Sequence, residues 1–186
     1  MGRILVLASL LLLSGELLAN TSERLREANF ATQRTLSEAS LERKNQSVLT
    51  YLWVDVYAAA FYAPIQASAS QAFDSPLKQR LELYYFRNIA REDVIKAAWT
   101  TLNRQHSPAT LARLRSELDA LHDKFQDIQP GDRYALNFAP ESGLSLERNG
   151  QIAFTSQDPE LARAYLGIWL APNGLSDTLR SQLLAR

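Results

Sequence analysis

The sequence contains no cysteine, and this absence excludes two features at once. There can be no disulfide framework, and no lipid-modified cysteine at the junction of an export signal. Zinc-ligand spacings, a glycine-rich phosphate loop and a nucleophile-elbow motif are missing from the sequence as well. We therefore predict neither a metal site nor a cofactor.

An excess of charge of one sign is also missing. Twenty Lys and Arg residues balance 20 Asp and Glu residues, so the formal net charge is zero. Surfaces that bind nucleic acid carry a basic excess, so we predict no nucleic-acid partner.

The sequence has no apolar run long enough to span a bilayer, which takes roughly 20 residues. Its most apolar run covers residues 4–13, after the basic Arg3 and before the small residue Ala19. This order is typical of a secretory signal peptide, and the alternative is an uncleaved anchor. We predict a signal peptide at 1–19 and one soluble domain at 20–186, periplasmic or secreted, with no stable membrane span after cleavage.

Residues 48–62 carry a dense mixture of rings, β-branched residues and three consecutive alanines, and this favours one long strand. Both of its faces are largely apolar, which predicts a central strand covered on both sides. Asp55 would then be a carboxylate at risk of burial, in need of a partner. Residues 20–46 form a polar lead-in.

The remaining patterns predict an α+β fold with a largely antiparallel sheet. Alternation predicts a strand over 79–89 and another over 133–140, and Asn149-Gly150 predicts a type I′ hairpin. Helical spacing begins at 91, and Ser107-Pro108 and Asp158-Pro159 predict further helix starts. The leucine stripe of 111–121 predicts core packing, and His106 and His122 are predicted to lie on the surface.

An ordered series of segments resembles the chalcone isomerase-like family, in particular its bacterial exported branch. The series is DVYAAAFYAP, LELYYFRNI, AAW, GD before a strand, NGQIAF and LGIWLAP, within about residues 45–186. The resemblance implies an open-faced β-sandwich, with a large antiparallel sheet, helices packed on one side and a cleft between them. The small residues of 58–60 would let helices approach, and the rings would border the cleft.

The resemblance also implies two kinds of function. Enzymes of the family close a chalcone ring by addition of a phenolate, using a cation and oriented hydroxyl groups. Tyr57 stands near the family's threonine, Glu92 near its tyrosine and Trp99 near its asparagine. The family's arginine has no clean match, because Asn45 or Leu49 falls at its position, with Arg43 and Lys44 close by. Non-catalytic relatives bind fatty acids through an arginine and a tyrosine, which requires only an apolar cleft and a cation.

Because these residues differ from the family's catalytic ones, we predict a non-catalytic binding protein for a small hydrophobic acid, either fatty-acid-like or aromatic. The alternatives are a protein-interaction module without a ligand and an isomerase of chalcone-like compounds. Arg87 closes an apolar strand and is either a surface residue or a cation that faces the cleft. The candidate ligand-binding residues are Arg87, Tyr57, Tyr62, Tyr85, Trp99 and Arg43.

Overall fold

The structure, a computed structural model, describes residues 20–186, so the predicted signal peptide lies outside the described residues. Seven strands form one antiparallel sheet in which each strand pairs with the next in the sequence. The strands are β1 (Gln33–Leu36), β2 (Ala39–Tyr51), β3 (Val54–Ala63), β4 (Gln79–Tyr85), β5 (Arg133–Ala139), β6 (Gly143–Arg148) and β7 (Gln151–Ser156).

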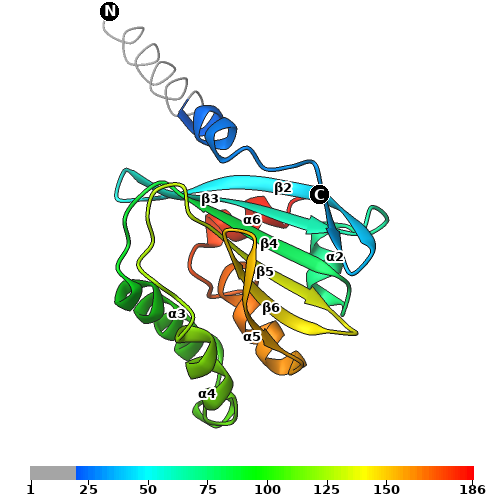
Figure 1. Cartoon of the computed structure of the whole chain (residues 1–186), viewed down its shortest axis with the longest axis vertical. Coiled ribbons are helices and arrows are strands. Elements are labelled where there is room, and N and C mark those ends of the chain that lie inside the picture. The colour runs from blue at the N-terminus through cyan, green and yellow to red at the C-terminus, as the bar shows by residue number, and fades with distance from the viewer. Residues whose placement is uncertain (1–19) are drawn as a thin grey trace, which may run out of the picture.

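The helices cover the two faces of this sheet unequally (Figure 1). One face packs against α2 (Ala69–Asp74), α3 (Arg91–Gln105), α4 (Pro108–His122), α5 (Pro159–Leu170) and α6 (Asp177–Leu183). A helix at 20–28 lies on the other face. The side chains of Ser107, Asp158 and Ser176 accept hydrogen bonds from the first turns of α4, α5 and α6, and the helix starts at Ser107 and Asp158 were predicted from the sequence. The predicted α+β fold with helices beside a large antiparallel sheet is confirmed.

Strand β3 is buried on both faces, because every residue from Tyr57 to Ala63 is at most 4% exposed. Ala59 and Phe61 point into the main core beneath the helices. Ala58, Ala60 and Tyr62 point the other way, against the N-terminal segment. The alanines therefore permit close approach on both sides of the strand, and only Ala59 serves the helix side that the sequence analysis had assigned to all three.

The face beneath the N-terminal segment holds a buried charge cluster around Glu82. This side chain is 1% exposed, and its carboxylate accepts hydrogen bonds from Arg34 at 2.8 Å, Arg80 at 3.1 Å and Arg133 at 2.8 Å. Burial opposes the ionisation of Glu82, but hydrogen bonding and charge from Arg34 and Arg80 outweigh it, so the pKa of the carboxyl is lowered. The cluster joins β1, β4 and β5 on one face of the sheet.

One prediction about the first half of the chain was wrong. The run 48–62 is two strands, because the chain turns at Leu52 and Trp53, which both have positive φ angles. No element was predicted in the polar lead-in, which forms the helix at 20–28, strand β1 and most of β2. Asp55 has the partners that its position required: Asn20, Arg24 and Thr50 donate to its carboxylate at 2.7–3.2 Å.

A search of the described residues for membrane spans finds no helix with the length and apolar character to cross a bilayer.

The close packing on both faces of β3 can be tested by enlarging its alanines one at a time. We expect Ala58→Leu and Ala59→Leu each to lower the free energy of unfolding by roughly 1–3 kcal/mol, because neither side chain has room to grow. Ala112→Leu is the matched control, since Ala112 is exposed on α4. Chemical denaturation measures all three, and an unchanged midpoint for Ala58→Leu would show that the N-terminal segment does not pack on the sheet.

Candidate functional site

A cleft of about 690 Å³ opens between one end of the sheet and the helices α3 and α5. The β2 and β3 residues next to the 52–53 turn form one side, and the connection from β4 to α3 forms the mouth. Its apolar lining comes from Leu49, Val56, Ile89, Val94, Ala97, Ala98, Phe125, Ile168 and Leu175, together with the rings of Tyr51, Tyr57, Tyr165 and Trp169. The volume falls within the roughly 300–1,000 Å³ typical of small-molecule sites.

The floor of the cleft is fixed by a hydrogen bond between two buried rings. Trp169 Nε1 donates to the Tyr57 hydroxyl at 2.9 Å, and this bond ties helix α5 to strand β3. Behind Tyr57 lies Tyr85, with ring centroids 5.3 Å apart in an edge contact. Burial raises the pKa of the Tyr57 hydroxyl above its ordinary value. The hydroxyl therefore keeps its proton at neutral pH and can donate it to a polar atom in the cleft.

The mouth of the cleft carries charges of both signs. Arg87 is exposed, and its Nε donates to the Asp55 carbonyl at 3.3 Å. Asp93, at the start of α3, is also part of the lining. An anionic group at the mouth would be attracted by Arg87 and repelled by Asp93, so the pair favours one position for a carboxylate.

The structure brings together only some of the predicted site residues. Tyr57 and Arg87 line the cleft, and Tyr85 lies directly behind Tyr57 in the core. Trp99 is on α3 but outside the cleft lining, where it contacts His122 and lies beneath Arg115. These contacts give Trp99 a packing role between α3 and α4.

Tyr62 and Arg43 lie on the opposite face of the sheet. They are cross-strand partners on β3 and β2. The Tyr62 hydroxyl donates to the Ala31 carbonyl at 2.9 Å, and Arg43 donates to the Phe30 carbonyl. Both side chains hold the N-terminal segment against the sheet, and the sheet separates them from the cleft.

His122, predicted to lie on the surface, is instead a buried residue next to the cleft. It is 3% exposed, and its ring packs against Trp99, Phe125 and Tyr165 at centroid distances of 5.4–6.4 Å. Neither ring nitrogen has a hydrogen-bond partner among the described residues. Burial is the main cause that lowers the pKa of His122 to about 4, so the ring is neutral at pH 7. The spacing of His122 could have predicted its burial, because it follows the core residue Leu118 by four positions and so lies on the same face of α4.

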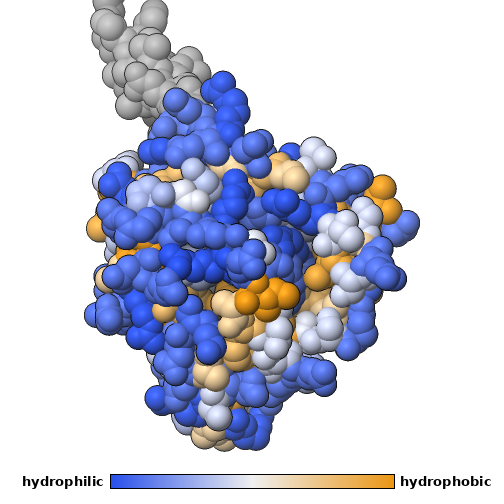
Figure 2. Space-filling model, viewed as in Figure 1, coloured by the Kyte–Doolittle hydropathy of each residue, from blue (hydrophilic) through white to orange (hydrophobic). Residues whose placement is uncertain are grey.

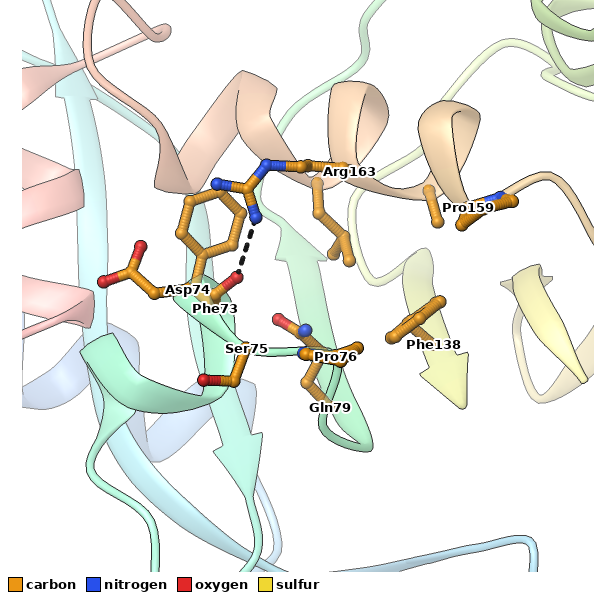
Figure 3. A pocket seen from close by; sticks show the side chains of 10 residues that line it. Phe73, Asp74, Ser75, Pro76, Gln79, Phe138, Pro159 and Arg163 are labelled. Atoms are coloured by element: carbon orange, nitrogen blue, oxygen red, sulfur yellow. Dashed lines mark hydrogen bonds between the residues drawn. The ribbon is translucent and has the colours of Figure 1, made fainter. Parts of the chain in front are cut away.

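A second hollow, of about 180 Å³, lies at the opposite end of the sheet (Figure 3). Helix α5 contributes Pro159 and Arg163 to one wall, and Gln79 and Phe138 face them from the ends of β4 and β5. Gln79 is 3% exposed, and its Nε2 donates to the Ala72 carbonyl at 3.0 Å. This hollow is much smaller than the cleft and falls below the usual size of a site for a drug-sized ligand.

Comparisons with known proteins agree with this architecture. The family described as chalcone isomerase-like matches residues 22–185. The crystal structure of a fatty-acid binding protein from Arabidopsis thaliana is similar, with a TM-score of 0.61 and 15% identity over 83% of this chain and 90% of that chain. At this identity the likeness shows a shared fold. A search of curated protein sequences finds no match.

The buried imidazole of His122 predicts a specific dependence of stability on pH. The unfolded chain takes up a proton on this histidine near pH 6.5, whereas the folded chain does so only near pH 4. The stability that the neutral ring provides is therefore present above pH 6.5 and is lost as the pH falls toward 4. The lost free energy of unfolding should be up to about 3 kcal/mol.

His122→Phe removes this titration and keeps a ring in the cluster. We expect its unfolding free energy to fall less between pH 7 and pH 4 than that of the wild type, as measured by urea denaturation at each pH. Acidic groups that titrate in the same range are common to both proteins and cancel in the difference. Parallel pH profiles for the two proteins would contradict the burial of a neutral histidine at this position.

Proposed function

This chain belongs to the chalcone isomerase-like family, and from that premise we propose that it is an exported binding protein for a small hydrophobic acid. The ligand would be fatty-acid-like or aromatic, and it would occupy the cleft between the sheet and helices α3 and α5. The observation that carries the proposal is an apolar cleft of about 690 Å³ with a single arginine, Arg87, in its lining. Export rests on the predicted signal peptide at 1–19.

The chemistry of the cleft suits a ligand with an apolar body and one acidic end. Apart from the mouth, its walls are mostly aliphatic side chains and rings, with Thr50 and Ser176 as the polar exceptions, so transfer of an apolar chain from water into the cleft is favourable. A carboxylate buried among those walls without a partner would be strongly disfavoured. The acid therefore lies with its carboxylate toward Arg87, whose planar guanidinium matches a carboxylate with two hydrogen bonds.

The Tyr57 hydroxyl gives the floor one polar group, next to the indole of Trp169. In the proposed complex it donates to a polar atom on the ligand body, such as a hydroxyl or carbonyl oxygen. A purely aliphatic tail would leave that hydroxyl with its Trp169 bond alone, so the floor favours ligands that carry a second oxygen.

The residues at the positions of the family's catalytic residues support ligand binding better than ring closure. Tyr57 places a large ring where the family has a threonine, and it occupies space on the floor. Glu92 is exposed at the start of α3 and absent from the cleft lining, and Trp99 lies outside that lining as well. A phenolate in this cleft has Arg87 as its cation, but of the three positions only Tyr57 supplies a hydroxyl group, whereas ring closure requires several oriented ones.

The carboxylate contact is tested by removing the cation. We expect Arg87→Ala to weaken binding of a fluorescent fatty acid by roughly 1–3 kcal/mol, because a charge-assisted hydrogen bond is lost at an exposed mouth. Binding of the matching fatty alcohol should change little, since it has no charge to pair. Arg163→Ala is the matched control, because Arg163 is an exposed arginine at the other hollow. Equal acid affinities for wild type and Arg87→Ala would remove Arg87 from the site.

The position of the apolar tail is tested by filling the cleft. Ala97 lines the cleft from α3 and is only partly buried, so a larger ring at this position can enter the open space. We expect Ala97→Trp to reduce acid affinity by at least about tenfold, while the thermal midpoint stays close to that of the wild type. Ala112→Trp, on the exposed side of α4, should leave affinity unchanged. Undiminished binding by Ala97→Trp would place the ligand elsewhere.

A further inference from the structure

The turn between β2 and β3 exposes three consecutive large apolar side chains. Tyr51 is 67% exposed, Leu52 72% and Trp53 94%. Within residues 20–186 only two other large hydrophobic residues are exposed, Ile65 and Ile152, and each stands alone. On the face seen in Figure 2, hydrophilic residues dominate, and hydrophobic residues gather near the centre and below it. A tryptophan and a leucine side by side in solvent are therefore an exception on this molecule.

The backbone of this turn makes the exposure more unusual. Leu52 and Trp53 have φ angles of 46° and 67°, in the left-handed region that large side chains disfavour. The turn between β6 and β7 has the same sign of φ at both positions, but it uses Asn149 and Gly150, the residues that suit it. The β2–β3 turn therefore has a strained backbone at two residues whose side chains make little contact with the rest of the domain.

We infer that the β2–β3 turn docks on the surface of a lipid bilayer and inserts Leu52 and Trp53 into its interface. The adjoining residue Tyr51 lines the cleft, as do Leu49 and Thr50 before it. Docking would therefore bring the mouth of the cleft to the membrane surface, where an apolar acid can enter without crossing water. The inferred route rests on the proposed function, whereas the docking itself does not.

A bilayer fits the size and chemistry of this surface better than a protein partner does. A specific protein interface buries about 800 Å² on each side with complementary shape, and three side chains on one turn are too few to supply it. Insertion into a bilayer requires no shape complementarity. Tryptophan and tyrosine are the residues enriched at the boundary between lipid and water. Exposed Arg87, beside the mouth, adds a cation that can meet lipid phosphates.

The chain also enters the domain at this end. Asn20, the first described residue, donates to the Asp55 carboxylate at 3.0 Å, two positions after Trp53. The apolar run 4–13 precedes it in the sequence. The bond from Asn20 to Asp55 places the start of the described chain beside the β2–β3 turn.

The test separates the side chains of the turn from its fold. The double variant Leu52→Asn/Trp53→Gly places in the turn the residues that its backbone favours. The thermal midpoint of this variant should therefore equal or exceed that of the wild type. Protein purified after expression of the full chain is mixed with phosphatidylcholine vesicles and separated by flotation. We expect the wild type to float with the vesicles and the double variant to bind them at least about tenfold more weakly.

Two further variants locate the contact. Ile65→Ser removes an equally exposed residue beyond the other end of β3, so its vesicle binding should match the wild type. Brominated lipid should quench the fluorescence of the wild type, and Trp53→Phe should keep vesicle binding but lose most of this quenching. Failure of the wild type to bind vesicles, or equal binding by the double variant, would overturn the inference.

Acid binding in the absence of vesicles distinguishes this inference from the proposed function. The double variant leaves the cleft lining intact, so its affinity for a soluble fluorescent acid should equal that of the wild type. Vesicle docking without acid binding would refute the proposed function alone. Acid binding without vesicle docking would refute the inference alone.

Discussion

Burial of strand β3 on both faces is the constraint on which the rest of the structure depends. A strand with seven consecutive buried residues needs a cover on each side, and two different layers supply it. Helices α2 to α6 cover one face, and the segment from the helix at 20–28 to β1 covers the other. Tyr57 is the first of these buried residues, and it also lines the cleft. The cleft therefore lies at the point where β3 becomes covered on both faces.

The two faces of the sheet differ in chemistry, and this difference decides which of them can hold an apolar ligand. The N-terminal face carries Glu82 with its three arginines, extended by Asn137 and Glu147 through Arg80. A buried charge cluster of this kind requires its partners in fixed positions, since an unpaired charge costs several kcal/mol. The helix side has apolar residues and rings at the corresponding positions. The open space next to β3 is therefore apolar, and the polar network lies behind it.

Elements with local signals could be predicted from the sequence, and those without them could not. Capping residues and helical spacing marked α3 to α5, and Asn149-Gly150 marked the β6–β7 hairpin. The polar residues of β1 and β2 gave no strand signal, and Leu52-Trp53 gave no turn signal. Within the site, Arg87 and Tyr57 were predicted to meet, and they do line one cleft. Tyr62 lies five residues after Tyr57 on the same strand, so the alternation of side chains directs it to the other face.

Two departures from local rules adjoin the cleft, while others lie elsewhere in the described residues, among them the positive φ angles of Ser37 and Glu38 and the unpartnered Oε1 of Gln79. His122 is a buried polar ring without a hydrogen-bond partner, and it contacts the cleft residues Phe125 and Tyr165. The strained 52–53 turn follows the cleft residue Tyr51 directly. The buried charges of the opposite face, in contrast, are paired. Inconsistency between sequence and local structure is expected to concentrate at functional sites, because only function compensates for its cost. A binding site in this cleft would account for the two departures that adjoin it, whereas Ser37, Glu38 and Gln79 need an explanation of their own.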